Sequence, residues 1–227
     1  MAGAPERLTV VPTGRHGLPP DIVATYQRER LLAATIDLVA KRGYRGTSID
    51  HIVKSAKVGY VAFYELFEGK EDCFLAAFDR IVEETGEALA AAVATETEWP
   101  QQICAALETL LKLIAAEPAR ARVGLVEVQA AGRNAYARYE DAIDGAVPKL
   151  REGRALSVEA ATLSDTLEEA ILGGIAWILH QRLVKGEVQK TGGVLGETIQ
   201  IALSPYLGDA EVRRLAVADR RGRPGDA

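Results

Sequence analysis

The amino-acid sequence predicts an all-α protein of about nine helices, about three short ones followed by about six longer ones. Apolar residues recur at positions i, i+3, i+4 and i+7 from residue 21 to residue 206, which is the spacing of one helix face. Proline, glycine and capping residues divide this pattern into segments of helix length. No segment alternates with a period of two and is rich in β-branched residues, so we expect no sheet.

The first helix is expected to begin at Asp21, a candidate N-cap that follows two prolines. It is expected to end at Gly43, because glycine commonly terminates a helix and the two residues before it are basic. Its inward face is a broad stripe. The stripe consists of Leu31, Leu32, Thr35, Ile36, Leu38 and Val39.

A second, short helix is expected next, with Thr47 as its cap and Asp50 as a weak capping-box partner. A turn at residues 56–58 leads into a third short helix that ends near Phe67. Two short helices joined by a tight turn, with another helix packed behind them, form a helix-turn-helix unit. Such a unit presents its second helix to the major groove of DNA, so these residues indicate a DNA-binding domain.

The longer helices are expected over residues 70–94, from Pro100 to an interruption at Pro118, and from there to about residue 131. Further helices are expected over residues 133–150, from about residue 163 to 185, and from residue 191 to 206. We expect residues 1–20 to form a flexible basic arm and residues 21–69 the helix-turn-helix domain. Residues 70–207 form the helical body, and residues 208–227 are expected to be a disordered tail.

Composition excludes several classes of protein. With 227 residues, 48% apolar and 26% charged, the chain has the makeup of a globular domain. The net charge of −5 excludes a uniformly basic nucleic-acid binder, but residues 1–70 hold 10 Lys+Arg against 7 Asp+Glu. A basic head on an acidic body would approach a polyanion in one orientation. The sequence has neither a membrane-spanning apolar run nor a secretory signal, and a reduced, cytoplasmic protein is the simplest interpretation.

Several short motifs keep a fixed order and spacing between residues 28 and 75. They are Gly43-Tyr44, Thr47-Ser48-Ile49, Ile52, Ala56, Val58, Phe63-Tyr64, Phe67 and Lys70-Glu71. In this arrangement they resemble the DNA-binding domain of the tetracycline-repressor (TetR) family of bacterial transcriptional regulators. The resemblance implies a double-stranded DNA operator as partner, repression that a small-molecule effector relieves, and a homodimer formed by the last two long helices as a four-helix bundle.

The resemblance also implies particular DNA contacts. Thr47 and Ser48 would touch backbone phosphate from the start of the second helix, as would Tyr64 and Lys70. The segment from Gly59 to Ala62 departs from the family pattern, because it lacks the usual polar and basic residues. The residues themselves add further candidates, of which the last two belong to the arm. They are Arg28, Lys57, Gly59, Tyr60, Val61, and Arg15 with His16.

Lys57 is a second departure, because the family usually has a glycine in this turn. If the backbone there needs a positive φ, a lysine costs on the order of 1 kcal/mol. Tyr60 offers one hydroxyl to base edges and Val61 could meet a thymine methyl. We therefore expect weak direct readout and a larger share for phosphate contacts and DNA shape.

The middle helices are expected to enclose a ligand cavity. The candidate wall residues are Phe74, Phe78, Leu107, Leu110, Ile114, Glu127, Gln129, Tyr136, Tyr139, Trp177 and His180. Gln129, Tyr136 and His180 could orient a ligand, because they are polar residues on otherwise apolar helix faces. The alternative is that these residues are ordinary core, since apolar residues at helical spacing usually are. Small residues in the last long helices, such as Gly173 and Gly174, fit either a dimer interface or packing within one chain.

Two other classes of function compete with this interpretation. The chain has no G-x-S-x-G, H-E-x-x-H, P-loop or G-x-G-x-x-G motif, so we do not expect an enzyme. His16, His51 and His180 have no metal-ligand spacing to either cysteine, and we expect neither a metal nor a cofactor. The remaining alternative is a helical ligand-binding or protein-interaction module without specific operator binding.

Overall fold

The structure, a computed structural model, describes residues 19–187 and 191–214, and within these ranges it contains helices and no strand. The helices are α1 (Pro20–Gly46), α2 (Ile49–Ala56), α3 (Tyr60–Leu66), α4 (Lys70–Val93), α5 (Trp99–Ala116), α6 (Pro118–Leu125), α7 (Arg133–Asp144), α8 (Val147–Arg151), α9 (Val158–Ala161), α10 (Leu167–Val184) and α11 (Thr191–Leu207). Two 3-10 helices are interspersed, η1 (Glu127–Ala130) and η2 (Glu152–Leu156). The all-α prediction is confirmed.

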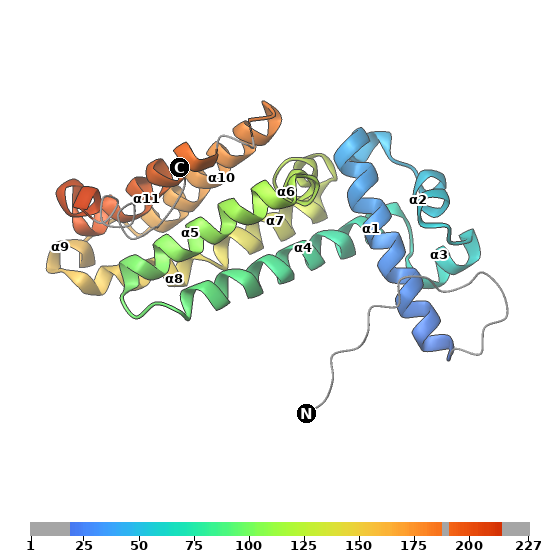
Figure 1. The fold of residues 1–227 in the computed structure, drawn as a ribbon, viewed down its shortest axis with the longest axis horizontal. Helices are drawn as coiled ribbons and strands as arrows, with labels where there is room; N and C mark the ends of the chain where they lie inside the picture. The colour runs from blue at the N-terminus through green and yellow to red at the C-terminus, as the bar shows by residue number, and fades with distance from the viewer. Residues whose placement is uncertain (1–18, 188–190, 215–227) are drawn as a thin grey trace, which may run out of the picture.

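The helices form a head and an elongated body (Figure 1). Helices α1, α2 and α3 make up the head. Helix α4 begins beside the head and runs along the body against α5, so it joins the two parts. Helices α10 and α11 pack on each other on the other side of α5, and α9 lies at the end of the body far from the head (Figure 1).

Most predicted helix boundaries agree with the structure to within a few residues. Helix α1 has a sharp kink at Gly43, whose φ of 76° and ψ of 160° are not helical, so the predicted stop at this residue is confirmed. The segment 133–150 is divided at Gly145 into α7 and α8. The helix predicted from about residue 163 begins at Leu167, and a separate turn of helix, α9, precedes it. These divisions bring the number of α-helices in the described residues above the predicted nine.

Two predictions concern the ends of the chain. The arm, with Arg15 and His16, lies outside the described residues up to residue 18, as does the tail beyond residue 214. The predicted end of the body at residue 207 is too early. Residues 209–214 are helical and Val212 is 2% exposed, because it packs into the apolar core of the body.

The apolar core has two parts. One part holds the head together and continues through the first half of α4 to Val123, Val128 and Ala135, so the head is not packed independently of the body. The other part lies within the body, around Leu111 and Ile114 of α5 and Ile171, Ile175 and Leu179 of α10. Burial of these side chains is the main stabilising term of the fold.

Candidate DNA-binding surface and ligand cavity

The start of α2 is capped by Ser48 and not by Thr47 as predicted. The Ser48 hydroxyl accepts a hydrogen bond from the backbone N–H of His51 at 3.3 Å, and Nδ1 of His51 accepts one from the Ser48 N–H. The predicted capping-box partner, Asp50, is therefore also wrong. Thr47 is 2% exposed and donates its hydroxyl to the carbonyl oxygen of Gly43, so this hydroxyl closes the preceding turn and does not face solvent.

The turn between α2 and α3 has the left-handed backbone that the missing glycine suggested. Lys57 has φ 51° and ψ 43°, and it is the one non-glycine residue with positive φ in the described ranges. The N–H of Val58 donates to the carbonyl oxygen of Val53 at 3.0 Å, which closes the end of α2. The sharp reversal directs α3 away from α2 while the side chain of Lys57 remains exposed.

Helix α3 presents an exposed face of mixed aromatic and apolar character. Tyr60, Val61 and Tyr64 are 47%, 75% and 58% exposed. Phe63, on the opposite face, is fully buried in the head and anchors the helix there. Gly59 precedes the helix in extended conformation, and an added Cβ there would contact nothing within 4 Å. The exposed face therefore offers Tyr60, Val61 and Tyr64 to a partner.

The hydroxyl of Tyr60 is held by α2. It donates a hydrogen bond to Oδ1 of Asp50 at 2.8 Å, while Lys54 donates to Oδ2 of the same carboxylate at 2.8 Å. Hydrogen bonds from Lys54 and Tyr60 lower the pKa of Asp50, and the bond to Asp50 raises the pKa of Tyr60. Both effects keep the carboxylate ionised and the phenol protonated near neutral pH.

Lys70, at the start of α4, points back to the corner between α1 and α2. Its ammonium donates to the carbonyl oxygens of Tyr44 and Thr47, both at 3.1 Å, and lies 4.1 Å from the centre of the Tyr44 ring. An ammonium group has three N–H donors, so one remains beyond these two bonds. Lys70 therefore fixes the first turn of α4 to the head. Arg28 is likewise engaged, with its guanidinium 4.8 Å from the centre of the Phe67 ring.

A cavity of about 410 Å³ lies in the body, between the two parts of the core. Its walls come from α4, α5, α6, α7 and α10 and are mostly apolar. Of the predicted wall residues, Phe78, Leu107, Leu110, Ile114 and Tyr139 line it. Side chains that the sequence analysis did not single out complete it, among them Ile81, Val82, Leu89, Leu113, Ile143, Leu172 and Leu179.

The other predicted wall residues lie elsewhere. Phe74 is fully buried in the head-side core. Tyr136 and Trp177 are 45% and 60% exposed on the outer faces of α7 and α10. His180 stacks on Trp177 and hydrogen bonds to the carbonyl oxygen of Leu125 at 2.9 Å, with Gln129 beside it, so these polar groups form a surface cluster. Helical spacing shows which residues share a helix face, but it does not show whether that face points into the cavity or toward solvent.

The charged residues of the cavity wall are Glu84, Glu117 and Arg120. Arg120 pairs with Glu84, and its Nε lies 3.1 Å from Glu117. One turn earlier on α4, Arg80 pairs with Glu84 at 2.7 Å and with Glu29 of α1. Burial would raise the pKa of Glu84, but the hydrogen bonds and charges of Arg80 and Arg120 outweigh it and lower that pKa. A continuous chain of ion pairs thus runs from the cavity wall to the head.

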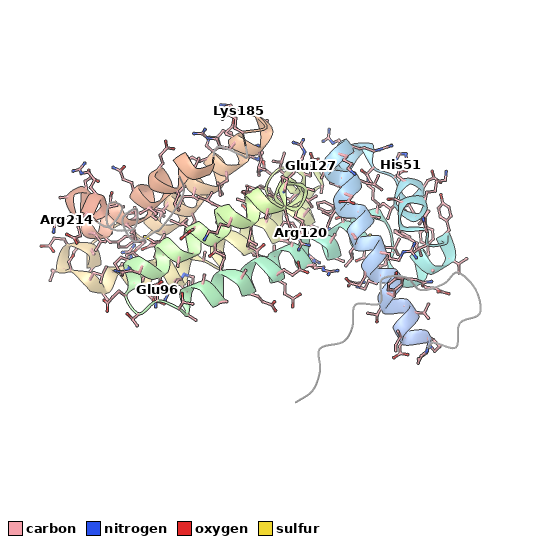
Figure 2. All side chains as sticks on the ribbon, viewed as in Figure 1. His51, Glu96, Arg120, Glu127, Lys185 and Arg214 are labelled. Atoms are coloured by element: carbon pink, nitrogen blue, oxygen red, sulfur yellow. The ribbon has the colours of Figure 1, made fainter. Side chains whose placement is uncertain are left out.

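Glu127 makes a second connection between body and head. It is 7% exposed, and its Oε2 accepts a hydrogen bond from the backbone N–H of Tyr44 at 3.0 Å, while Arg122 pairs with Oε1 at 3.1 Å. Figure 2 shows Glu127 and Arg120 at the end of the body that faces α1, far from Glu96 and Arg214. A Cβ at Gly43 would lie 3.3 Å from Oε2 of Glu127, so a glycine here permits the close approach. Glu127 therefore lies at the head–body junction and not in the cavity wall.

The sequence carried only weak indications of these two connections. Glu127 was predicted as a cavity-wall residue, whereas its partner is a backbone group that no side-chain pattern can identify. Within the described residues no cluster of three or more histidines, cysteines and carboxylates could hold a metal. No described helix is long and apolar enough to cross a membrane.

Comparisons with known proteins agree with this geometry. Residues 31–77 match the family model of bacterial regulatory proteins of the tetR family. A segment of 55 residues is 40% identical to an uncharacterized HTH-type transcriptional regulator in the lacX 3' region of Lactococcus lactis subsp. lactis. This segment covers 24% of the present chain and 28% of that relative, so the likeness in sequence is confined to one part of each protein.

Solved structures share the fold over most of the chain. A TetR family transcription regulator from Marinobacter aquaeolei VT8 is similar with a TM-score of 0.65 and 20% identity, over 82% of this chain and 97% of that one. The fatty acid degradation regulator FadR from Bacillus halodurans has a TM-score of 0.67 and 16% identity, over 77% and 97%. FadR from Bacillus subtilis, solved in complex with stearoyl-CoA, has a TM-score of 0.62 and 14% identity, over 79% and 98%. At these identities the likeness establishes the fold.

Proposed function

This chain belongs to the TetR family of bacterial regulatory proteins, and we propose that it is a DNA-binding transcriptional regulator whose affinity for its operator is controlled by a small ligand. The observation that carries this proposal is the exposed face of α3. Three large side chains are exposed on a short helix that two others hold in a fixed orientation, and none of the three is buried by the part of the chain that the structure describes. A major groove roughly 12 Å wide accommodates one such helix.

The proposed DNA contacts follow the geometry. Tyr60 and Val61 would meet base edges, because the first residues of a recognition helix enter the groove. Exposed groups at the rim would meet phosphates, namely Ser48, Lys57, Tyr64 and the one remaining donor of Lys70. Thr47 is not included as a direct contact, because its buried hydroxyl is engaged within the head. Arg28 stays a candidate, because a guanidinium that lies over the Phe67 ring keeps its N–H donors.

We propose that the protein acts as a homodimer through α10 and α11. A Cβ at Gly173 or Gly174 would contact nothing within 4 Å, so packing against the described residues of the same chain does not account for these small residues. Trp177 and Val184 on α10 and Ile201 on α11 are exposed large apolar side chains of these two helices. A second copy would cover them, and two recognition helices would then read two half-sites about one DNA turn apart.

The cavity is the proposed site of the effector. Its volume of about 410 Å³ and its mostly apolar wall suit an apolar molecule or the apolar part of an amphiphile. The B. subtilis neighbour binds stearoyl-CoA, which has a long apolar chain, but its identity of 14% does not carry that ligand over to this chain. We propose that an occupant shifts α4 and α6, which line the cavity: α4 carries the ion pair to the head, and α6 leads directly into η1, which carries the Glu127 contact. Repression relieved by the ligand is the family's usual arrangement and the one proposed here. The chromosomal operator would place the protein in the bacterial cytoplasm.

A gel-shift titration with DNA from the protein's own promoter region tests the proposal. We expect specific binding that falls steeply with salt, because phosphate contacts release counterions. Binding no tighter than to unrelated DNA would favour the alternative, a helical ligand-binding or interaction module. Coupling of about 1–3 kcal/mol would weaken operator binding about 5- to 150-fold when the effector is bound.

Occupancy of the cavity can be tested separately with a fluorescent apolar probe, anilinonaphthalene sulfonate. Leu110→Trp fills the cavity and should reduce probe binding, whereas Tyr136→Phe alters a predicted wall residue that lies outside it and should not. Equal probe binding by both variants would exclude the cavity as the site.

A further inference from the structure

We infer that Asp50 sets the base preference of this regulator by fixing the hydroxyl of Tyr60 as a hydrogen-bond acceptor, so that Tyr60 selects an amino base, adenine or cytosine, at one position of each half-site. This inference rests on the proposed DNA-binding function and goes beyond it, because it assigns the chemistry that one side chain reads. Asp50 is a positioning residue in this scheme, since it acts through Tyr60.

Tyr60 is the hydrogen-bonding side chain at the tip of the recognition helix. The first four residues of α3 are Tyr60, Val61, Ala62 and Phe63, and only the first has a polar side-chain group. Tyr60 is 47% exposed, so its hydroxyl reaches solvent although it touches α2. Any hydrogen bond between these four side chains and a base edge therefore passes through one oxygen.

The single proton of that hydroxyl is already donated in a hydrogen bond within the protein. A phenol has one O–H donor and two acceptor lone pairs, and the donor points to Oδ1 of Asp50 at 2.8 Å. An ionised carboxylate can only accept, so the direction of this bond is fixed. The other carboxylate oxygen is held by Lys54 at 2.8 Å, which keeps Asp50 turned toward Tyr60 and offsets its charge near phosphate.

The lone pairs that remain can only accept. In the major groove the exocyclic amino groups of adenine and cytosine are donors, whereas O6 of guanine and O4 of thymine are acceptors. The Tyr60 oxygen is therefore attracted to the amino groups of adenine and cytosine and repelled by O6 of guanine and O4 of thymine. Tyr60 would thus distinguish base pairs whose amino base, adenine or cytosine, lies on the near strand from those whose keto base, guanine or thymine, lies there. It would not distinguish A·T from C·G.

Selection of binding sequences from a randomised duplex DNA library, with the full-length protein, tests this inference. For the wild type we expect one position in each half-site to favour A or C over G or T on one strand. The expected preference is on the order of fivefold, the ratio that corresponds to one net hydrogen bond of about 1 kcal/mol.

Four variants separate the role of the Tyr60 hydroxyl from a general effect of α3 on affinity. Tyr60→Phe removes the oxygen, and Asp50→Ala frees the hydroxyl to donate as well as accept, so both should abolish this preference. Asp50→Glu retains a carboxylate, which can only accept from Tyr60 and Lys54, and should keep it. Tyr64→Phe changes an exposed tyrosine on the same helix. It should lower the affinity for all DNA sequences equally without altering any base preference.

The outcomes are distinct. A selected motif that is unchanged in Tyr60→Phe and Asp50→Ala would overturn the inference and leave the DNA-binding function intact. A position that favours G or T and depends on Tyr60 would also overturn it. Failure of the wild type to select any motif would overturn both the inference and the proposed function. Circular dichroism of each variant verifies that it is folded, and Tyr60→Phe, which changes one exposed atom, provides the test should Asp50→Ala unfold.

Discussion

Two buried glutamates, at opposite ends of the body, are held in very different ways. Glu168, at the start of α10, is fully buried and accepts hydrogen bonds from Arg154 at 2.7 and 2.9 Å and from Tyr206 at 2.9 Å. Arg154 also donates to two backbone carbonyls, so η2, α10 and α11 are joined in one network. Glu127, at the head–body junction, has one backbone donor and one arginine.

The difference indicates which part of the molecule can move. At the far end, breaking the network would leave several buried polar groups without partners, which is costly in a low-dielectric interior. At the junction, a shift of η1 relative to α1 gives up the hydrogen bond from the Tyr44 N–H to Glu127, while the ion pair between Arg122 and Glu127 lies within the body and moves with it. The loss of one hydrogen bond lies within the few kcal/mol that a ligand can supply. The body would therefore stay rigid while the head is repositioned.

The largest effect is expected from Glu168→Gln. Glutamine keeps the shape of the side chain but loses its charge and turns an amide N–H₂ toward the guanidinium of Arg154, so we expect a loss of about 2–4 kcal/mol in the free energy of unfolding. Chemical denaturation at a fixed protein concentration measures it. Glu169→Gln, at the exposed neighbouring position, should change stability by less than about 0.5 kcal/mol. Equal losses of stability in the two variants would show that the buried network around Glu168 contributes no more than the exposed Glu169 does.

Low pH should remove the stabilisation that the Glu168 carboxylate contributes. The hydrogen bonds from Arg154 lower the pKa of Glu168 to about 2, against burial, which raises it, and Tyr206 lowers it further. The folded pKa lies below the unfolded one, so the contribution is complete above about pH 4.5 and is lost as pH falls toward 2. We expect the stability difference between wild type and Glu168→Gln to shrink by about 2 kcal/mol over this range. A difference that does not vary with pH would contradict the assignment.

Glu127→Ala should have a smaller effect, a loss of about 1–2 kcal/mol, because it leaves the Tyr44 N–H and Arg122 without their acceptor. Hydrogen exchange of the Tyr44 amide should become faster, and this reports on the junction directly. Glu127→Gln keeps an acceptor oxygen and should retain part of the protection. Unchanged exchange in the alanine variant would show that the junction does not depend on this contact.

The smallest effect is expected inside the head, at the turn between α2 and α3. Lys57→Gly relieves a left-handed backbone and should raise the free energy of unfolding by about 0.5–1 kcal/mol. Lys54→Gly, within α2, should lower it by about 1 kcal/mol, because glycine is a poor helix former. Thermal melting compares the two. A stabilised head with unaltered Tyr44 exchange would sharpen the view that the weak point is the junction and not the head itself.

The helices and the identity of the head could be predicted because both depend on local order. Apolar spacing, prolines and glycines located nearly every helix, and Gly43 and Lys57 are two of the backbone positions with positive φ in the described residues. The cap of α2 was misassigned by one residue, since Thr47 and Ser48 are both good caps and only the backbone conformation selects between them.

The cavity wall was predicted only in part. Phe78, Leu110 and Ile114 line it, but Trp177 and Tyr136 lie on the outside, because each helix can rotate about its axis without changing its own periodicity. The contact between Glu127 and Tyr44 joins residues 83 positions apart through a backbone group, so no local pattern could reveal it.

The sequence by itself thus determined the helices, the turn between α2 and α3 and the likeness of the head to the TetR family, because each follows from the residue types within a few turns of chain. Only the tertiary structure decided which helix faces enclose the cavity, which carboxylates are buried, and that Asp50 accepts the hydrogen bond of the Tyr60 hydroxyl. Those features depend on the relative placement of helices, which long-range packing fixes and short-range propensity does not.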